Sequence, residues 1–126
     1  MAGPKLNGTG VEKLKTLENA QRQLQRVHGL VEQMAMAVKD LKPVQVQCMQ
    51  IKRAAAPMVS SLKGQFGMIS DQVAALVLVA GRNGSDPVRL RSMRESVAQI
   101  RVQLEISTAK TIELHTVDAD HAKHPA

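Results

Sequence analysis

The sequence predicts an all-α fold, an antiparallel bundle of three long, heptad-patterned helices that is completed by helices of a partner protein. In three stretches of the 126-residue chain, apolar residues recur at alternating steps of three and four, the spacing of a helix seam. Phe66 is the only aromatic residue, so the core must be aliphatic, whereas sheets favour aromatic and β-branched side chains. Glycine and proline separate the stretches.

The first helix is expected to begin near Gly10, because Thr9 and Glu12 have the spacing of a capping box. It should end near Leu41, because the residue before Pro43 is disfavoured in helical angles. Its seam consists of Leu17, Ala20, Leu24, Val27, Val31, Met34, Val38 and Leu41.

The second helix is expected to run from about Val44 to Ala80 and to be kinked or split at Pro57. Gly64 and Gly67 should weaken it by up to about 1 kcal/mol each relative to alanine. Gly81 can end it. Its main seam consists of Val59, Leu62, Phe66, Ile69, Val73, Leu76 and Ala80.

The third helix is expected to begin after Asp86 as N-cap, with Pro87 in the first helical position. Its seam becomes polar toward its end: Leu90, Met93, Val97, Ile100, Leu104, Ser107, Thr111 and Leu114. We therefore predict one helical domain over residues 10–115, a disordered lead over residues 1–9 and a flexible tail over residues 116–126.

Composition limits the class of protein. The longest apolar run, Val73–Ala80, is far shorter than the ~20 residues that span a bilayer, so we expect a soluble protein without membrane contact. Cys48 is the only cysteine, which excludes an intramolecular disulfide and fits a reducing compartment. The formal net charge of +6 favours acidic partners.

Candidate catalytic groups are few, and we predict that the protein is not an enzyme and has no cofactor or small-molecule substrate. His28, Ser60 and Ser61 lack the strand-turn-helix setting of a nucleophile elbow. The glycine-rich segment 81–85 lacks the lysine and spacing of a phosphate loop. The C-terminal imidazoles and carboxylates should bind metal only adventitiously, so no metal site is predicted: His115, Asp118, Asp120, His121 and His124.

Further apolar residues flank the seams. They either widen the buried stripe of an ordinary bundle or form a second face for a partner helix, and the pattern leaves both open: Leu30, Ala35, Ala37, Val77, Leu78, Val79, Val88, Val102, Ile106 and Ile112. The predicted partner interface consists of seam residues and one flanking valine: Leu17, Leu24, Val31, Val38, Leu62, Phe66, Ile69, Val73, Leu76, Val77, Met93, Val97, Ile100 and Leu104.

A basic patch is predicted around the last turn and the third helix, formed by Arg82, Arg89, Arg91, Arg94 and Arg101. The pairs Arg91–Glu95 and Arg101–Glu105 should partly neutralise it. Because aromatic stacking platforms are lacking, we interpret this patch as a solvated face or an ion-pairing surface for an acidic protein, in preference to a nucleic-acid site.

The stretch Ile69–Leu76, with sequence Ile-Ser-Asp-Gln-Val-Ala-Ala-Leu, resembles the second helix of subunit eleven of the Mediator head module. That family has a Leu-Ser-x-Gln-Ile-x-x-Leu element that ends in a Val-small-small-Gly turn, here Val79–Gly81. Arg53–Ala56 is similar to the family's entry to this helix, and Leu14–Glu18 to its opening helix. Ala75 and Pro57 depart from the pattern, which favours aromatic residues there. Subunit twenty-two has a similar layout.

The resemblance implies a nuclear subunit of a transcription coactivator. It would form an intermolecular helical bundle with subunit twenty-two, dock on subunit seventeen and link regulators to RNA polymerase II. Two alternatives remain: a homo-oligomeric coiled-coil scaffold and a basic, helical nucleic-acid-binding subunit. Without the resemblance, the expected location is the cytosol.

Overall fold

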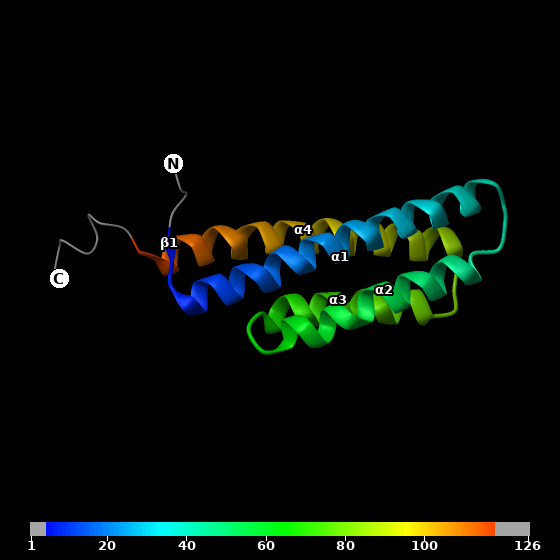
Figure 1. Ribbon diagram of the computed structural model, residues 1–126. Helices are drawn as coiled ribbons and strands as arrows, with labels where there is room; N and C mark the ends of the chain where they lie inside the picture. Colours follow the sequence, from blue (N-terminus) through cyan, green and yellow to red (C-terminus); the bar gives the residue numbers. More distant parts are fainter. Residues whose placement is uncertain (1–4, 118–126) are drawn as a thin grey trace.

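The computed structural model describes residues 5–117 and is all-helical. Four helices follow one another in alternating directions: α1 (Gly8–Lys39), α2 (Gln45–Lys63), α3 (Gly67–Gly81) and α4 (Asp86–His115) (Figure 1). Each helix packs against its sequence neighbours, and α1 also packs against α4, so the arrangement is bundle-like. Two-residue strands, β1 (Lys5–Leu6) and β2 (Thr116–Val117), pair antiparallel beside the helix ends.

Both ends of α1 differ from the prediction. Asn7 is the N-cap, and its Oδ1 accepts a hydrogen bond of 2.7 Å from the backbone N–H of Gly10, so the helix begins at Gly8 without the Thr9–Glu12 capping box. The helix ends at Lys39, and Leu41 has a positive φ of 55° and is 94% exposed. The last apolar residue of the predicted seam therefore lies outside both the helix and the core.

The prediction of three helices is corrected to four, because the chain turns between Lys63 and Gly67 and does not divide at Pro57. Pro57 lies inside α2 on its exposed side, while Ala55 and Met58 beside it are fully buried. Packing on both sides of the proline thus holds α2 together. The turn brings α3 back along α2, so that α2 packs on α1 and α3 packs on α4.

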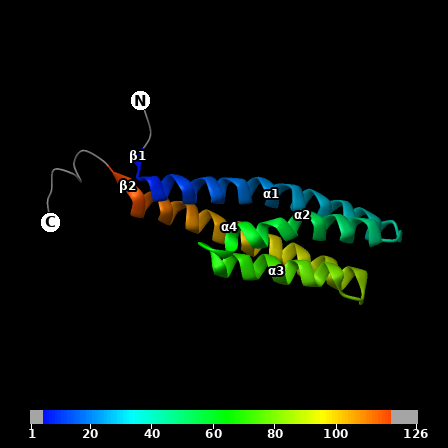
Figure 2. The ribbon, with the colours of Figure 1, turned by 60° about the horizontal axis from the view of Figure 1, so that its bottom comes forward.

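The helices are unequal in length, with 32 residues in α1, 30 in α4, 19 in α2 and 15 in α3. The α1–α4 pair consequently extends beyond α2 and α3 (Figures 1 and 2). Where only two helices meet, the inner face of α4 becomes polar. Thr111 is 5% exposed and donates its hydroxyl hydrogen to Ser107 O, and Gln21 of α1 donates to the Thr108 hydroxyl at 3.3 Å. This explains the polar end of the third seam.

The core lies along the inner faces of all four helices and is aliphatic. Its largest fully buried side chains are Leu17, Val27, Val31, Met34, Ile51, Met58, Leu62, Val73, Leu76, Met93, Ile100 and Leu104. Phe66, the N-cap of α3, is only half-buried against this core. None of the helices within residues 5–117 has an apolar segment sufficient to cross a bilayer.

The first turn of α1 and the last residue of α4 approach closely. Asn7 N donates to His115 O at 3.0 Å, and an ideal Cβ at Gly10 would lie 2.5 Å from the His115 Cβ. This contact joins the β1–β2 pair to the helices. Lys5–Leu6 and Thr116–Val117, expected in flexible ends, are therefore part of the fold, and the rest of the predicted lead and tail lies outside the described residues.

The burial of two leucines of α3 predicts different losses of stability when each is replaced by alanine. Leu76 is 1% exposed, so Leu76→Ala should lower the free energy of unfolding by about 2–5 kcal/mol, because it removes buried contacts and leaves a cavity. Leu78, 61% exposed on the same helix, is the matched control, and Leu78→Ala should change stability by less than about 0.5 kcal/mol. Urea denaturation measures both, and equal losses would contradict the inward face assigned to α3.

Two glycines in the first turn of α1 should also respond differently to alanine. Gly10→Ala places a methyl group against His115 and should destabilise the protein by about 1–3 kcal/mol. Gly8→Ala meets nothing within 4 Å and should be neutral or slightly stabilising, because alanine favours helix over glycine. Thermal unfolding of both variants checks this. Equal melting temperatures would contradict the close contact of the two helix ends.

Candidate protein-binding surface

The predicted partner interface lies in the chain's own core. Eleven of its fourteen residues are 3% exposed or less, namely Leu17, Leu24, Val31, Leu62, Ile69, Val73, Leu76, Met93, Val97, Ile100 and Leu104. The other three, Val38, Phe66 and Val77, pack on this core as partly buried residues. This corrects the interface assignment: the fourth helix lets the seams cover one another within one chain, so a partner cannot reach them without opening the bundle.

The flanking apolar residues divide between the two interpretations. Those that widen the buried stripes are Leu30, Ala35, Ala37, Val77 and Val79, which are buried or pack on the core. Four others remain on the surface: Leu78 (61% exposed), Val88 (57%), Val102 (50%) and Ile106 (42%). Ile112 is half-buried. The exposed members are candidates for contact with another protein.

The outward side of α3 carries the most apolar of these surfaces. Met68 is 70% exposed and Leu78 61%, and Asp71 and Ala75 lie exposed between them. Steps of three, four and three keep these four residues, the α3 outer stripe, on one side of the helix. Asp71 is the only charged residue among the fifteen of α3. A helix that is apolar on all sides is normally buried, so the outer stripe has the composition of a contact surface.

The inner face of α3 fixes the orientation of this stripe. Ile69, Val73 and Leu76 are buried, and Ser70 donates its hydroxyl hydrogen to Val59 O of α2 at 2.8 Å. Rotation of α3 would therefore break a hydrogen bond and expose the core. Sequence reasoning singled out Leu78 but missed Met68, although the spacing of the stripe was a readable signal.

The segment that carries the outer stripe has a positive net charge. The segment from the start of α2 to the end of α3 contains three basic residues, Lys52, Arg53 and Lys63, and one acid, Asp71. All four are exposed. Lys52 lies near the end of α3, 3.9 Å from an ideal Cβ at Gly81, whereas Arg53 lines a hollow with Arg26 and Leu30 of α1.

The predicted arginine patch is not a single surface. The Arg89 guanidinium turns back toward the α3–α4 turn, where Nη1 donates to Arg82 O at 2.7 Å and Nη2 pairs with Asp86 at 2.8 Å. Arg94 points toward α1 and forms a bidentate pair with Glu32. Its Nε donates to Glu32 Oε2 at 3.0 Å and its Nη2 donates to Glu32 Oε1 at 2.8 Å. Two of the five arginines thus have carboxylate partners, and they lie toward different neighbouring helices.

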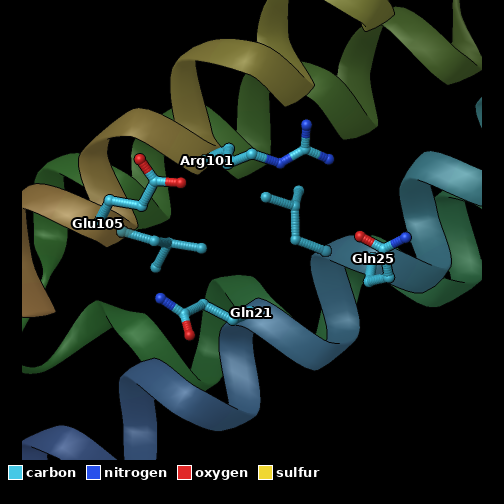
Figure 3. A pocket seen from close by; sticks show the side chains of 6 residues that line it. Gln21, Gln25, Arg101 and Glu105 are labelled. Atoms are coloured by element: carbon cyan, nitrogen blue, oxygen red, sulfur yellow. The ribbon is translucent and has the colours of Figure 1, made fainter.

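Arg101 lines a hollow of about 240 Å³ between α1 and α4 (Figure 3). Gln21 and Gln25 of α1 and Glu105 of α4 surround it, over Leu24 and Leu104. Among residues 5–117 the ion pairs within 4.0 Å are Arg89–Asp86 and Arg94–Glu32, so neither Arg91–Glu95 nor Arg101–Glu105 forms the pair that the sequence predicted. Arg82 and Arg91 are exposed to solvent.

Within the described residues no hydrogen bond joins the candidate catalytic residues to one another. The Ser61 hydroxyl donates to Met58 O in its own helix, and His28 lies half-buried on α1. Burial raises the pKa of the Cys48 thiol, which keeps it protonated at neutral pH beside the Met34 sulfur. Within the described part of the chain no three His, Cys, Asp or Glu residues are placed to bind a metal ion. His115 contacts Lys13, and the other candidate ligands, Asp118, Asp120, His121 and His124, lie outside the described residues.

Comparison of the chain with protein-family models, curated proteins and solved structures finds no match.

The Glu32–Arg94 pair predicts a small pH dependence of stability. The hydrogen bonds from Arg94 lower the pKa of the Glu32 carboxyl below its ordinary value of 4.5. Its contribution is therefore complete above about pH 4.5 and is lost as the pH falls through the lowered pKa. Because both side chains are about half-exposed, we expect Glu32→Gln to cost only about 0.5 kcal/mol at pH 7.

Urea denaturation from pH 7 to pH 3 measures this effect. The difference between wild type and Glu32→Gln should shrink toward zero at the acidic end. Glu95→Gln is the control on α4, because Glu95 is exposed and forms no ion pair within the described chain. A difference that persists at pH 3 would show that the effect does not arise from the ion pair.

Proposed function

We propose that this protein is a non-enzymatic assembly subunit that binds an amphipathic helix of a partner protein through the α3 outer stripe. The observation that carries the proposal is the exposure of Met68 and Leu78 on a helix whose other side is already buried in the core. Burying one such side chain stabilises a complex by about 1.5–3 kcal/mol. A helix laid along the stripe would bury both at once.

The partner should have an apolar face with acidic residues on its flanks. Its apolar side chains would contact Met68, Ala75 and Leu78, and its acids would lie near the exposed Lys52 at the end of α3. Such charge complementarity mainly raises the association rate and the specificity. Arg89 turns toward the α3–α4 turn, whereas Arg94 pairs with Glu32 of α1, so the predicted arginines do not form one continuous surface for a nucleic-acid backbone. This arrangement disfavours the alternative of a nucleic-acid-binding subunit.

The resemblance of Ile69–Gly81 to Mediator subunit eleven indicates a particular assembly to test. We propose the Mediator head as that assembly, with subunit twenty-two as the helical counterpart, subunit seventeen as a further contact and the nucleus as the location. In this proposal the partner packs on the outside of α3, because Ile69, Val73 and Leu76 are occupied by the chain's own core.

Aspartate substitutions on the outer stripe should weaken partner binding without unfolding the protein. Leu78→Asp and Met68→Asp each place a charge in the proposed contact, and each should weaken co-purification with subunit twenty-two at least about tenfold. Met36→Asp is the matched control, because Met36 is 67% exposed on α1, away from the stripe. Circular dichroism checks that all three variants keep their helices.

A photo-crosslinking residue at position 78, compared with one at position 36, identifies what covers the stripe. Crosslinks from position 78 to an acidic helix of another protein support the proposal. Crosslinks to a second copy of the chain, together with a defined homo-oligomer in sedimentation, would instead support a homo-oligomeric scaffold. Equal labelling from both positions would contradict a binding role for α3.

A further inference from the structure

A second surface feature, separate from the outer stripe, lies where α2 meets the α3–α4 turn. It is a cavity of about 360 Å³. Its lining residues come from α2, the end of α3, the turn and the start of α4: Gln45, Cys48, Met49, Lys52, Ala80, Gly81, Arg82, Asn83, Gly84 and Arg89. Three of them are basic and none is acidic. The cavity therefore has the charge of an anion site.

Arg89 is held in a fixed position at this cavity. Its Nη1 donates to Arg82 O at 2.7 Å and to Ala80 O at 3.5 Å, and its Nη2 donates to Asp86 Oδ1 at 2.8 Å. A guanidinium has five N–H donors, so two remain. The Nε atom is buried and has no hydrogen-bond partner among the described residues. Because Nε is covered, a ligand oxygen would accept a hydrogen bond from it only after a shift of the Arg89 side chain.

Lys52 and the turn glycines leave room for such a ligand. The Lys52 ammonium lies 3.9 Å from the position of an ideal Cβ at Gly81, which places it over the end of α3. Gly84 has a φ of +148°, a conformation that a side chain would strain, and an added Cβ there would meet nothing within 4 Å. The backbone at the mouth of the cavity is thus bare, with the amides of Gln45 and Asn83 as further donors nearby.

We propose that this cavity binds a phosphate group, held by Lys52, Arg82 and Arg89. A phosphate carries three strong acceptor oxygens and up to two charges, which matches three cations brought together from α2, the turn and α4. Asp86 neutralises one of the three charges and leaves a net charge of about two. The group could be free phosphate or a phosphate monoester, since both present the same oxygens.

The proposal competes with a purely structural role in which Arg89 and Lys52 serve only to stabilise the carbonyl end of α3. The two roles differ at Arg82, whose exposed side chain has no hydrogen bond or ion pair in the described structure. Removing the Arg82 side chain should leave the fold intact and weaken phosphate binding. The inference does not rest on the α3 outer stripe and can fail without affecting the proposed function.

The test is a titration of the full chain followed by two-dimensional amide NMR at constant ionic strength. Inorganic phosphate should give saturable shifts at Lys52 and over residues 81–84. Lys52→Ala and Arg82→Ala should each weaken binding at least about fivefold, while Arg91→Ala should leave it unchanged, because Arg91 is an exposed arginine that does not line the cavity.

A parallel titration with O-phosphoserine separates the two sources. Tighter binding of O-phosphoserine than of inorganic phosphate assigns the site to phosphate monoesters, and the reverse assigns it to the free ion. Shifts that do not saturate, that chloride reproduces at the same ionic strength, or that Arg91→Ala reduces as much as Arg82→Ala would overturn the proposal. Unchanged thermal unfolding of the variants confirms that lost binding is not lost folding.

Discussion

Close packing of aliphatic side chains along the inner faces of four helices holds this protein together. Without tryptophan or tyrosine, and with its one phenylalanine at a turn, the core has few large side chains to fill space. Leucine, methionine and valine must therefore interlock over a long contact. This requirement explains why α1 and α4 are long, why α2 and α3 fold back onto them, and why the proline in α2 does not divide that helix.

The period of the apolar residues predicted which side of each helix is buried, from Leu17 in α1 to Leu104 in α4. It did not predict the turn at Gly64–Phe66, because local propensity makes Pro57 the more costly residue inside a helix. The outcome depends on contacts with α1 and α4, which are distant in sequence. The N-cap of α1 was also predicted wrongly. Both Asn7 and Thr9 are suitable N-cap residues, and Asn7, whose backbone N–H donates to His115 O, is the one that caps the helix.

The binding surface was harder to predict than the core. Seam residues and outer-stripe residues are both apolar. A sequence therefore does not distinguish a leucine that packs in the core of its own chain from a leucine that would contact a partner protein. In the four-helix arrangement the seams cover one another, so Val73 is buried within its own chain. The candidate residue for contact with a partner is therefore Leu78, which is exposed. Likewise, Arg94 is drawn out of the predicted arginine patch by its ion pair with Glu32. Glu32 lies 62 residues before Arg94, so no local sequence pattern predicts this pair.

The antiparallel β1–β2 pair places Leu6 and Thr116 side by side, at the free end of the α1–α4 pair (Figure 2). A pulling force applied at these two points would act on neighbouring helix ends in opposite directions. The first load would fall on the few backbone hydrogen bonds of the strand pair and on the contact between Gly10 and His115. The two long helices would then separate turn by turn from this end. Mechanically, the molecule is weak along this axis although its core is continuous.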